Sequence, residues 1–155
     1  MKNKAKQIGC ALMLCLSCTM AHAEDVILLR PQFGAGTLDG RHCEHAGLRL
    51  LQGVTDIRRY GLELSRVNSK AGDFISTGIV LEQRLAGWFN MSIGTIAYLG
   101  VDQGSRNYPG VVANLGWEPE TNGALRPFVT LRNDVLFADR TLSGLSLSAG
   151  MGMEF

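Results

Sequence analysis

Apolar and polar residues alternate along most of this chain, and a two-residue period of this kind predicts β-strands. The alternation is clearest in residues 141–155, where Leu145, Leu147 and Met151 are separated by small or polar residues. Equally regular stretches predict five further strands, at residues 57–67, 74–85, 89–101, 109–118 and 125–137.

Two less regular stretches, residues 26–34 and 45–53, complete a set of eight strands. Pro31 in the first of them indicates a strand end or an edge strand, because proline cannot donate a backbone hydrogen bond to a neighbouring strand. A helix over residues 48–64 is the alternative, since several of its leucines also follow a helical period. Two glycines interrupt that helix, which favours strands.

The polar face of the predicted strands consists mostly of serine, glycine, asparagine and threonine. In a soluble β-sandwich, which is the alternative, the solvent face would carry long charged side chains. Small polar groups favour a narrow lumen, with the apolar face against lipid. Because hydrocarbon offers no hydrogen-bond partner to a strand edge, the sheet must then close. The sequence therefore predicts an all-β fold: a closed antiparallel up-and-down transmembrane β-barrel with eight strands.

An even barrel with both ends of the chain on one side alternates outer loops with inner turns. The predicted outer loops are residues 35–44, 69–73, 102–108 and 138–140, and the predicted inner turns are residues 54–56, 86–87 and 118–123.

Aromatic residues test this arrangement, because they belong at the two water–lipid interfaces of the outward face. Only Phe137 falls at the predicted outer end. The inner end has four outward aromatic residues, Tyr60, Phe89, Trp117 and Phe155. Three further aromatic residues have lumen parity: they fall at the alternate strand positions whose side chains are predicted to point into the lumen. They are predicted to plug the lumen or to pack at turns, and they are Trp88, Tyr98 and Phe128.

Seven charged residues share the lumen parity, and their signs nearly balance. They are Arg59, Glu63, Glu82, Arg84, Arg132, Asp134 and Glu154. An eight-stranded barrel is only wide enough for side chains to fill, and burying a charge without a partner costs several kcal/mol. We therefore predict a paired charge network that fills the cylinder. A narrow ion path is the alternative.

Residues 1–23 have the composition of a secretory signal peptide. Three lysines precede an apolar stretch that ends in an A-x-A step at Ala23, where we expect cleavage. A lipoprotein signal with an acylated Cys18 is the alternative. Cleavage leaves Cys43 as the one cysteine, which excludes a disulfide within the mature chain. Residues 24–155 then form a single barrel domain.

Composition excludes several functional classes. The chain has 155 residues, 46% of them hydrophobic and 19% charged, with a formal net charge of +1. These values match neither a disordered tail nor a nucleic-acid-binding protein. We also expect no cofactor, no metal and no catalytic group.

The last predicted strand presents Leu147, Met151, Met153 and Phe155 in alternation and finishes on the phenylalanine. This pattern resembles the carboxy-terminal signal that the Gram-negative outer-membrane assembly machinery recognises. With the signal peptide and the short mature length, the chain resembles the small eight-stranded barrels of the OmpA and OmpX type. The resemblance implies a monomer in the outer membrane of a Gram-negative bacterium. Its implied partners are membrane lipid, lipopolysaccharide, periplasmic chaperones and the barrel-assembly machinery.

An enzymatic role is an alternative that a second resemblance raises. Some small outer-membrane barrels edit lipid A through a histidine and a serine, and only His42 and His45 remain here after signal cleavage. The deacylase type carries His-x-Ser-Asn on a strand, and neither histidine has that context. The segment 41–45 also offers thiolate and imidazole groups of the kind that soft metals bind. A solvated loop is the simpler interpretation.

Surface contact is the remaining class of function. Arg41, His42, His45, Arg106 and Tyr108 fall in or beside the predicted outer loops, where they could contact lipopolysaccharide phosphates or another surface molecule. We therefore expect a non-enzymatic barrel with a structural, envelope-maintenance or surface-interaction role. A lipid A-modifying enzyme and a narrow ion-conducting pore are the alternatives.

Overall fold

The computed structural model describes residues 26–55, 57–70, 72–101, 106–121 and 124–155. The expected signal peptide and its cleavage site lie outside the described residues. No helix among the described residues is long and apolar enough to cross a membrane. The regular elements of this part of the chain are β1 (Ile27–Leu38), β2 (Arg41–Thr55), β3 (Arg58–Ser69), β4 (Gly72–Arg84), β5 (Phe89–Gly100), β6 (Tyr108–Trp117), β7 (Leu125–Phe137) and β8 (Thr141–Glu154).

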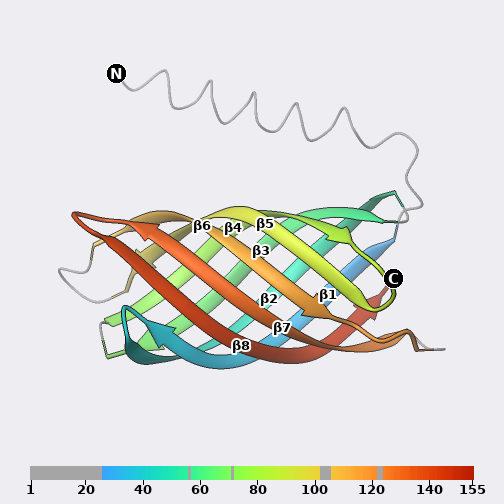
Figure 1. The fold of residues 1–155 in the computed structure, drawn as a ribbon, viewed down its shortest axis with the longest axis horizontal. Coiled ribbons are helices and arrows are strands. Elements are labelled where there is room, and N and C mark those ends of the chain that lie inside the picture. Colours follow the sequence, from blue (N-terminus) through green and yellow to red (C-terminus); the bar gives the residue numbers. More distant parts are fainter. Residues whose placement is uncertain (1–25, 56, 71, 102–105, 122–123) are drawn as a thin grey trace, which may run out of the picture.

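The strands form one closed antiparallel barrel, in which each strand pairs with its neighbours in sequence and β8 pairs with β1 (Figure 1). The predicted fold class is confirmed. Two ends can be distinguished. We call the end where β1 begins and β8 finishes the base, and the opposite end, where β1 turns into β2 and β7 into β8, the tip.

The register shifts as the sheet closes. If the paired residues are followed once around the barrel, the path returns to β1 at a residue ten positions further along that strand. The path runs from Ile27 through Gln52, Tyr60, Leu81, Ile93, Ala113, Asn133 and Leu145 to Thr37. A shift of this size tilts eight strands by about 35 to 45° from the axis and leaves an interior that side chains can fill.

The first hairpin differs most from the sequence-based prediction. Residues 35–44 were predicted to be an outer loop, but they form the ends of β1 and β2, and the turn contains only Asp39 and Gly40. These two residues have φ of 52° and 73°, which is the type I′ geometry that favours Asp-Gly. The alternation is blurred because glycines occupy lumen positions. A Cβ on Gly36 would overlap the backbone of β8.

Pro31 lies inside β1, so the expectation of a strand end or an edge is wrong. Its Cα is paired with Leu48 of β2, whereas the described register with β8 has no partner for Arg30 or Pro31. The pairing between β1 and β8 therefore has a local gap where proline has no amide hydrogen to donate.

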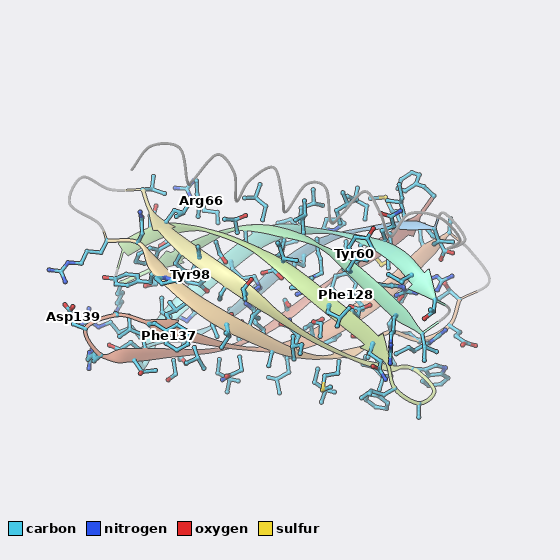
Figure 2. All side chains as sticks on the ribbon, turned by 90° about the horizontal axis from the view of Figure 1, so that it is seen from above. Tyr60, Arg66, Tyr98, Phe128, Phe137 and Asp139 are labelled. Atoms are coloured by element: carbon cyan, nitrogen blue, oxygen red, sulfur yellow. The ribbon has the colours of Figure 1, made fainter. Side chains whose placement is uncertain are left out.

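The outward face of the sheet exposes apolar side chains and the inward face buries polar ones, which is the reverse of a soluble protein. Leu62, Ile93 and Leu147 point outward with 57%, 54% and 57% of their surface exposed. On the lumen face, Glu63 and Glu82 are each only 1% exposed. Side chains cover both faces over the whole length of the barrel (Figure 2). An apolar outer wall around a polar interior is the arrangement of transmembrane barrels.

The Leu147→Arg variant tests which face meets lipid. Leu147 lies near the middle of β8, where an arginine on the lipid side is expected to destabilise the barrel by about 2 to 4 kcal/mol. Thr141→Arg, on the same face at the tip, should cost about 0 to 1 kcal/mol. Equilibrium urea unfolding in lipid vesicles measures both. Equal losses for the two variants would contradict the assigned faces.

Candidate functional site

A cluster of charged side chains ties opposite walls of the barrel together in the half of the lumen nearer the tip. Glu63 of β3 is ion-paired with Arg132 of β7 and accepts a 2.6 Å hydrogen bond from Nη2 of Arg49. Nε of Arg132 also donates to Oδ2 of Asp134 at 2.8 Å. The hydroxyl of Tyr98 donates to the same carboxylate oxygen at 2.9 Å. All five side chains are buried.

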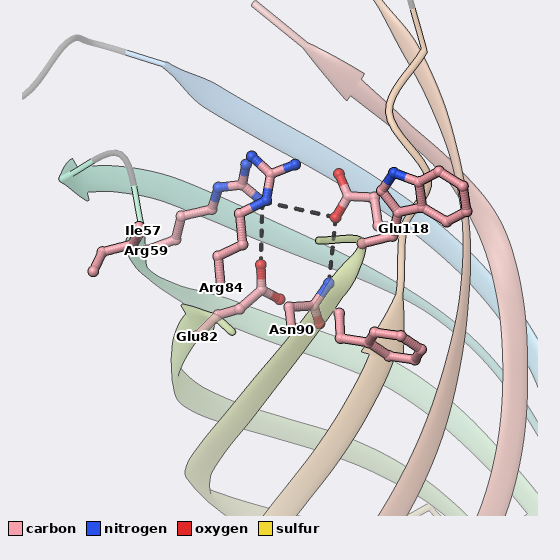
Figure 3. Close-up of a pocket in the computed structure, with 8 residues that line it drawn as sticks. Ile57, Arg59, Glu82, Arg84, Asn90 and Glu118 are labelled. Carbon is pink, nitrogen blue, oxygen red and sulfur yellow. Dashed lines mark hydrogen bonds and ion pairs between the residues drawn. The ribbon is translucent and has the colours of Figure 1, made fainter. Parts of the chain in front are cut away.

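A second cluster lies nearer the base (Figure 3). Glu82 accepts hydrogen bonds from Nη1 of Arg30 at 2.6 Å and from Nη1 of Arg59 at 3.2 Å. Glu118 is ion-paired with Arg30, lies 3.8 Å from Nη1 of Arg59, and accepts a 3.4 Å hydrogen bond from the amide of Asn90.

Arg49 joins the two clusters, because its Nη1 lies 3.9 Å from Oε2 of Glu82. We call the joined set the ladder. It consists of Arg30, Arg49, Arg59 and Arg132 with Glu63, Glu82, Glu118 and Asp134. Four positive and four negative groups give it no formal net charge. Each buried charge has an oppositely charged partner, which offsets part of the cost of its desolvation.

Small residues on the lumen face make room for these long side chains. A Cβ on Gly150 would lie 2.7 Å from the ring of Phe128. That ring in turn lies beneath the guanidinium of Arg30, 5.4 Å from its centroid, at the distance of a cation–π contact. The glycine therefore allows an aromatic ring to support an arginine of the ladder.

An apolar plug lies between the ladder and the tip. The Phe74 ring packs against Tyr98 and Tyr108, with centroids 5.8 Å and 6.0 Å apart. Leu38 and Leu136 belong to the same buried set. The two small cavities lined by ladder residues each have about 10 Å³, room for about one water molecule.

The structure brings together five of the seven charged residues that share lumen parity: Arg59, Glu63, Glu82, Arg132 and Asp134. The other two lie at the base, outside the ladder. Arg84 pairs with Glu120 at 2.9 Å, and Glu154 pairs with Arg126.

Sequence reasoning missed Arg30, Arg49 and Glu118. The two arginines lie in the first two strands, where glycines blur the alternation. Glu118 directly follows β6 and was assigned to a turn, although it continues the lumen parity of Asn114 and Gly116. The parity of the strand, extended by one residue, could have identified it.

The lumen-parity aromatic residues divide between the two expected roles. Tyr98 and Phe128 are buried in the lumen. Trp88 is 51% exposed and packs edge-on against Trp117 beside the β4–β5 turn, with centroids 6.3 Å apart.

The expected surface contacts require two corrections. His45 is only 7% exposed and faces the lumen, because residues 41–45 form a strand rather than a loop. Tyr108 packs against the plug. Arg41 and His42 are exposed, and the exposed Arg106 bonds Asp139 at 2.6 Å.

Strand geometry also separates the potential metal ligands of this segment. Cys43 and His45 point into the lumen, whereas His42 and Glu44 point outward. The described residues contain no group of three or more histidine, cysteine or acidic side chains that could hold a metal ion.

The residues of the expected assembly signal lie along β8 and directly after it. Leu147, Met151 and Phe155 are outward and exposed, and Met153 is partly buried. Recognition of this row by an assembly machinery stays a prediction.

A closed eight-stranded antiparallel barrel with an apolar outer wall has the architecture of the small outer-membrane barrels. The fold is similar to the N-terminal β-barrel domain of Pseudomonas aeruginosa OprF, with a TM-score of 0.62 and 8% identity over 85% of this chain and 100% of that chain. It is also similar to Neisserial surface protein A (NspA), with a TM-score of 0.63 and 10% identity over 86% of this chain and 98% of that chain.

The outer membrane protein OprG from Pseudomonas aeruginosa gives a TM-score of 0.50 and 12% identity over 86% of this chain and 97% of that chain. No protein-family model and no curated protein matches the sequence. The likeness to these three barrels is one of fold.

Glu63→Gln tests how far the barrel depends on keeping the buried charges of the ladder paired. The substitution leaves Arg49 and Arg132 buried beside a neutral amide, and we expect a loss of about 3 to 5 kcal/mol in the free energy of unfolding. Glu120→Gln, which breaks an exposed pair with Arg84, should cost less than about 1 kcal/mol. Urea unfolding in lipid vesicles measures both variants. A loss for Glu63→Gln as small as that for Glu120→Gln would show that the barrel does not depend on this pairing.

Proposed function

We propose that this protein is a closed barrel of the outer membrane that serves the envelope as a structural, non-conducting element. The observation that carries the proposal is the ladder, whose eight charged groups are paired with one another across the lumen. An ion moving through this lumen would have to separate pairs that are desolvated and hydrogen-bonded. Each buried charge that loses its partner costs several kcal/mol.

The plug supports the same conclusion from the tip side. Phe74, Tyr98 and Leu136 are each at most 4% exposed, so the ladder is separated from the tip by a packed apolar layer. Polar groups reach solvent more directly at the base, where the side chain of Arg59 is 19% exposed and that of Arg84 36%. Access from one end only is compatible with a filled cylinder and unsuited to conduction.

Lipid A chemistry is the enzymatic alternative, and the position of His45 weighs against it. A general base must come within hydrogen-bond reach of its substrate. His45 faces the lumen, whereas the acyl chains of a lipid would lie against the outer wall.

The proposal includes a mode of assembly and of membrane contact. The outward row of Leu147, Met151 and Phe155 would be read by the barrel-assembly machinery after delivery by periplasmic chaperones. The exposed Arg41 at the tip would contact lipopolysaccharide. The protein would act as a monomer in the outer membrane.

Planar-bilayer recording of the refolded protein tests the proposal. We expect no stable conductance steps from the wild-type chain. The double variant Arg49→Ser/Glu63→Ser removes one charge of each sign and enlarges the lumen, so we expect brief steps from it. That variant shows that the assay detects an opening. Stable wild-type steps that Arg132→Ala abolishes would instead establish an ion path and overturn the proposal.

A further inference from the structure

One asparagine lies on the outer wall of the barrel among apolar neighbours. Asn133 of β7 is exposed and points outward. In the register it is paired with Ala113 of β6 and Leu145 of β8. The next outward residues along its own strand are Leu131 and Val135. A polar side chain that faces hydrocarbon is costly unless it is hydrogen-bonded, and such residues commonly mark functional sites.

The hydrogen-bonding capacity of this side-chain amide is only partly used. Its Nδ2 donates to the carbonyl oxygen of Gly144 at 3.2 Å. Its Oδ1 accepts no hydrogen bond from any residue that the structure describes. Because the hydrocarbon core of a bilayer contains no water to supply one, a ligand of Asn133 must itself carry a hydrogen-bond donor on an apolar chain.

An apolar groove of about 660 Å³ in the outer wall begins at this asparagine. One side of the groove is a row of register partners across five strands: Asn133, Ala113, Ile93, Leu81 and Tyr60. The other side is the next row toward the tip: Val135, Val111, Thr95 and Ile79. The lining also includes three residues at lumen positions, where the backbone of the sheet forms the floor: Val80, Gly94 and Val112.

The depth of Asn133 matches the upper part of an acyl chain of the outer leaflet. Phe137, at the tip end of the same strand, is the outward aromatic residue of that interface. Asn133 precedes it by four residues, which places the amide about 10 Å below Phe137 for a rise of about 3.3 Å per residue and a tilt near 40°.

The groove continues from Asn133 toward the base. Neighbouring strands lie about 4.8 Å apart, so the row descends about 12 Å along the axis between Asn133 and Tyr60. Figure 2 shows Phe137 and Tyr60 toward opposite ends of the barrel. The groove therefore has a polar group at its upper end and an apolar course below it.

The structure assigns this groove to a 3-hydroxyacyl chain of lipid A. The hydroxyl group on the third carbon of such a chain lies close to the headgroup and donates a hydrogen bond to Oδ1 of Asn133. The rest of the chain lies along the apolar row toward Tyr60. An unsubstituted phospholipid chain has no donor at this depth. The assignment rests on the proposed contact with lipopolysaccharide and names the part of that lipid which the wall recognises.

A second copy of the chain fits this place less well. In a two-fold dimer the same patch of each subunit meets itself. Two concave grooves would then face each other and leave the space between them unfilled.

A lipid titration tests the assignment. The full chain, refolded in dodecylphosphocholine micelles, is titrated with lipid A and with a synthetic lipid A that lacks the free 3-hydroxyl groups, while the amide NMR shifts of β6 and β7 are followed. We expect lipid A to bind about fivefold more tightly, which is the contribution of one hydrogen bond. Asn133→Leu removes the amide at similar size and should bind both lipids alike. Altered mobility of the unboiled protein on gels confirms that the variant folds.

Asn68→Leu is the matched control, because Asn68 is an exposed outward asparagine of β3 outside the groove. It should keep the preference for the hydroxylated lipid. Arg41→Gln should weaken the binding of both lipids and also keep the preference, so the contact at the tip and the contact in the groove are measured separately.

Equal affinity of the wild-type chain for the two lipids would overturn the assignment and leave the contact through Arg41 standing. A preference that persists in Asn133→Leu would do the same. Absence of binding by either lipid would overturn both the assignment and the proposed contact with lipopolysaccharide. Dimers in sedimentation that Asn133→Leu dissociates would show that a second copy occupies the groove, which also overturns the assignment. None of these outcomes depends on whether the lumen conducts.

Discussion

Closure of eight strands with a register shift of ten residues leaves an interior that must be filled by side chains, and the rest of the molecule follows from this constraint. The interior cannot be filled with large apolar groups on every strand without overlap, so glycine alternates with long side chains. Where two strands approach, as at Gly36 and β8, no Cβ fits. Where space remains, arginines extend across it and meet carboxylates from the opposite wall.

The strands with regular alternation were predictable from sequence because the period of two depends only on which face each residue occupies. Glu63, Glu82, Arg132 and Asp134 could be placed in the lumen on that basis, since their strands alternate strictly. Parity alone could not pair them. The partnership of Arg132 with Glu63 depends on the closure and the shift between strands, which no local pattern records.

The errors at the first hairpin have a common physical origin. Glycines on the lumen face of β1 resemble loop residues in a sequence, although here they permit close packing. The short Asp39–Gly40 turn was therefore predicted to be part of a longer loop, and His45 was predicted to lie on the surface. Arg30 and Arg49 were lost for the same reason. Likeness of fold at 8 to 12% identity reflects the same principle, because many different residues satisfy an alternating pattern.

The contacts of the ladder join residues far apart in the chain: Arg30 and Glu118 are separated by 88 positions, and Glu63 and Arg132 by 69. An open sheet would leave these charges without their partners, and a buried charge without a partner costs several kcal/mol. The pairs join strands that are not neighbours in the sheet: Arg30 of β1 with Glu82 of β4, and Glu63 of β3 with Arg132 of β7. The ladder is therefore complete only when the sheet has curved far enough to bring these strands across the lumen from one another.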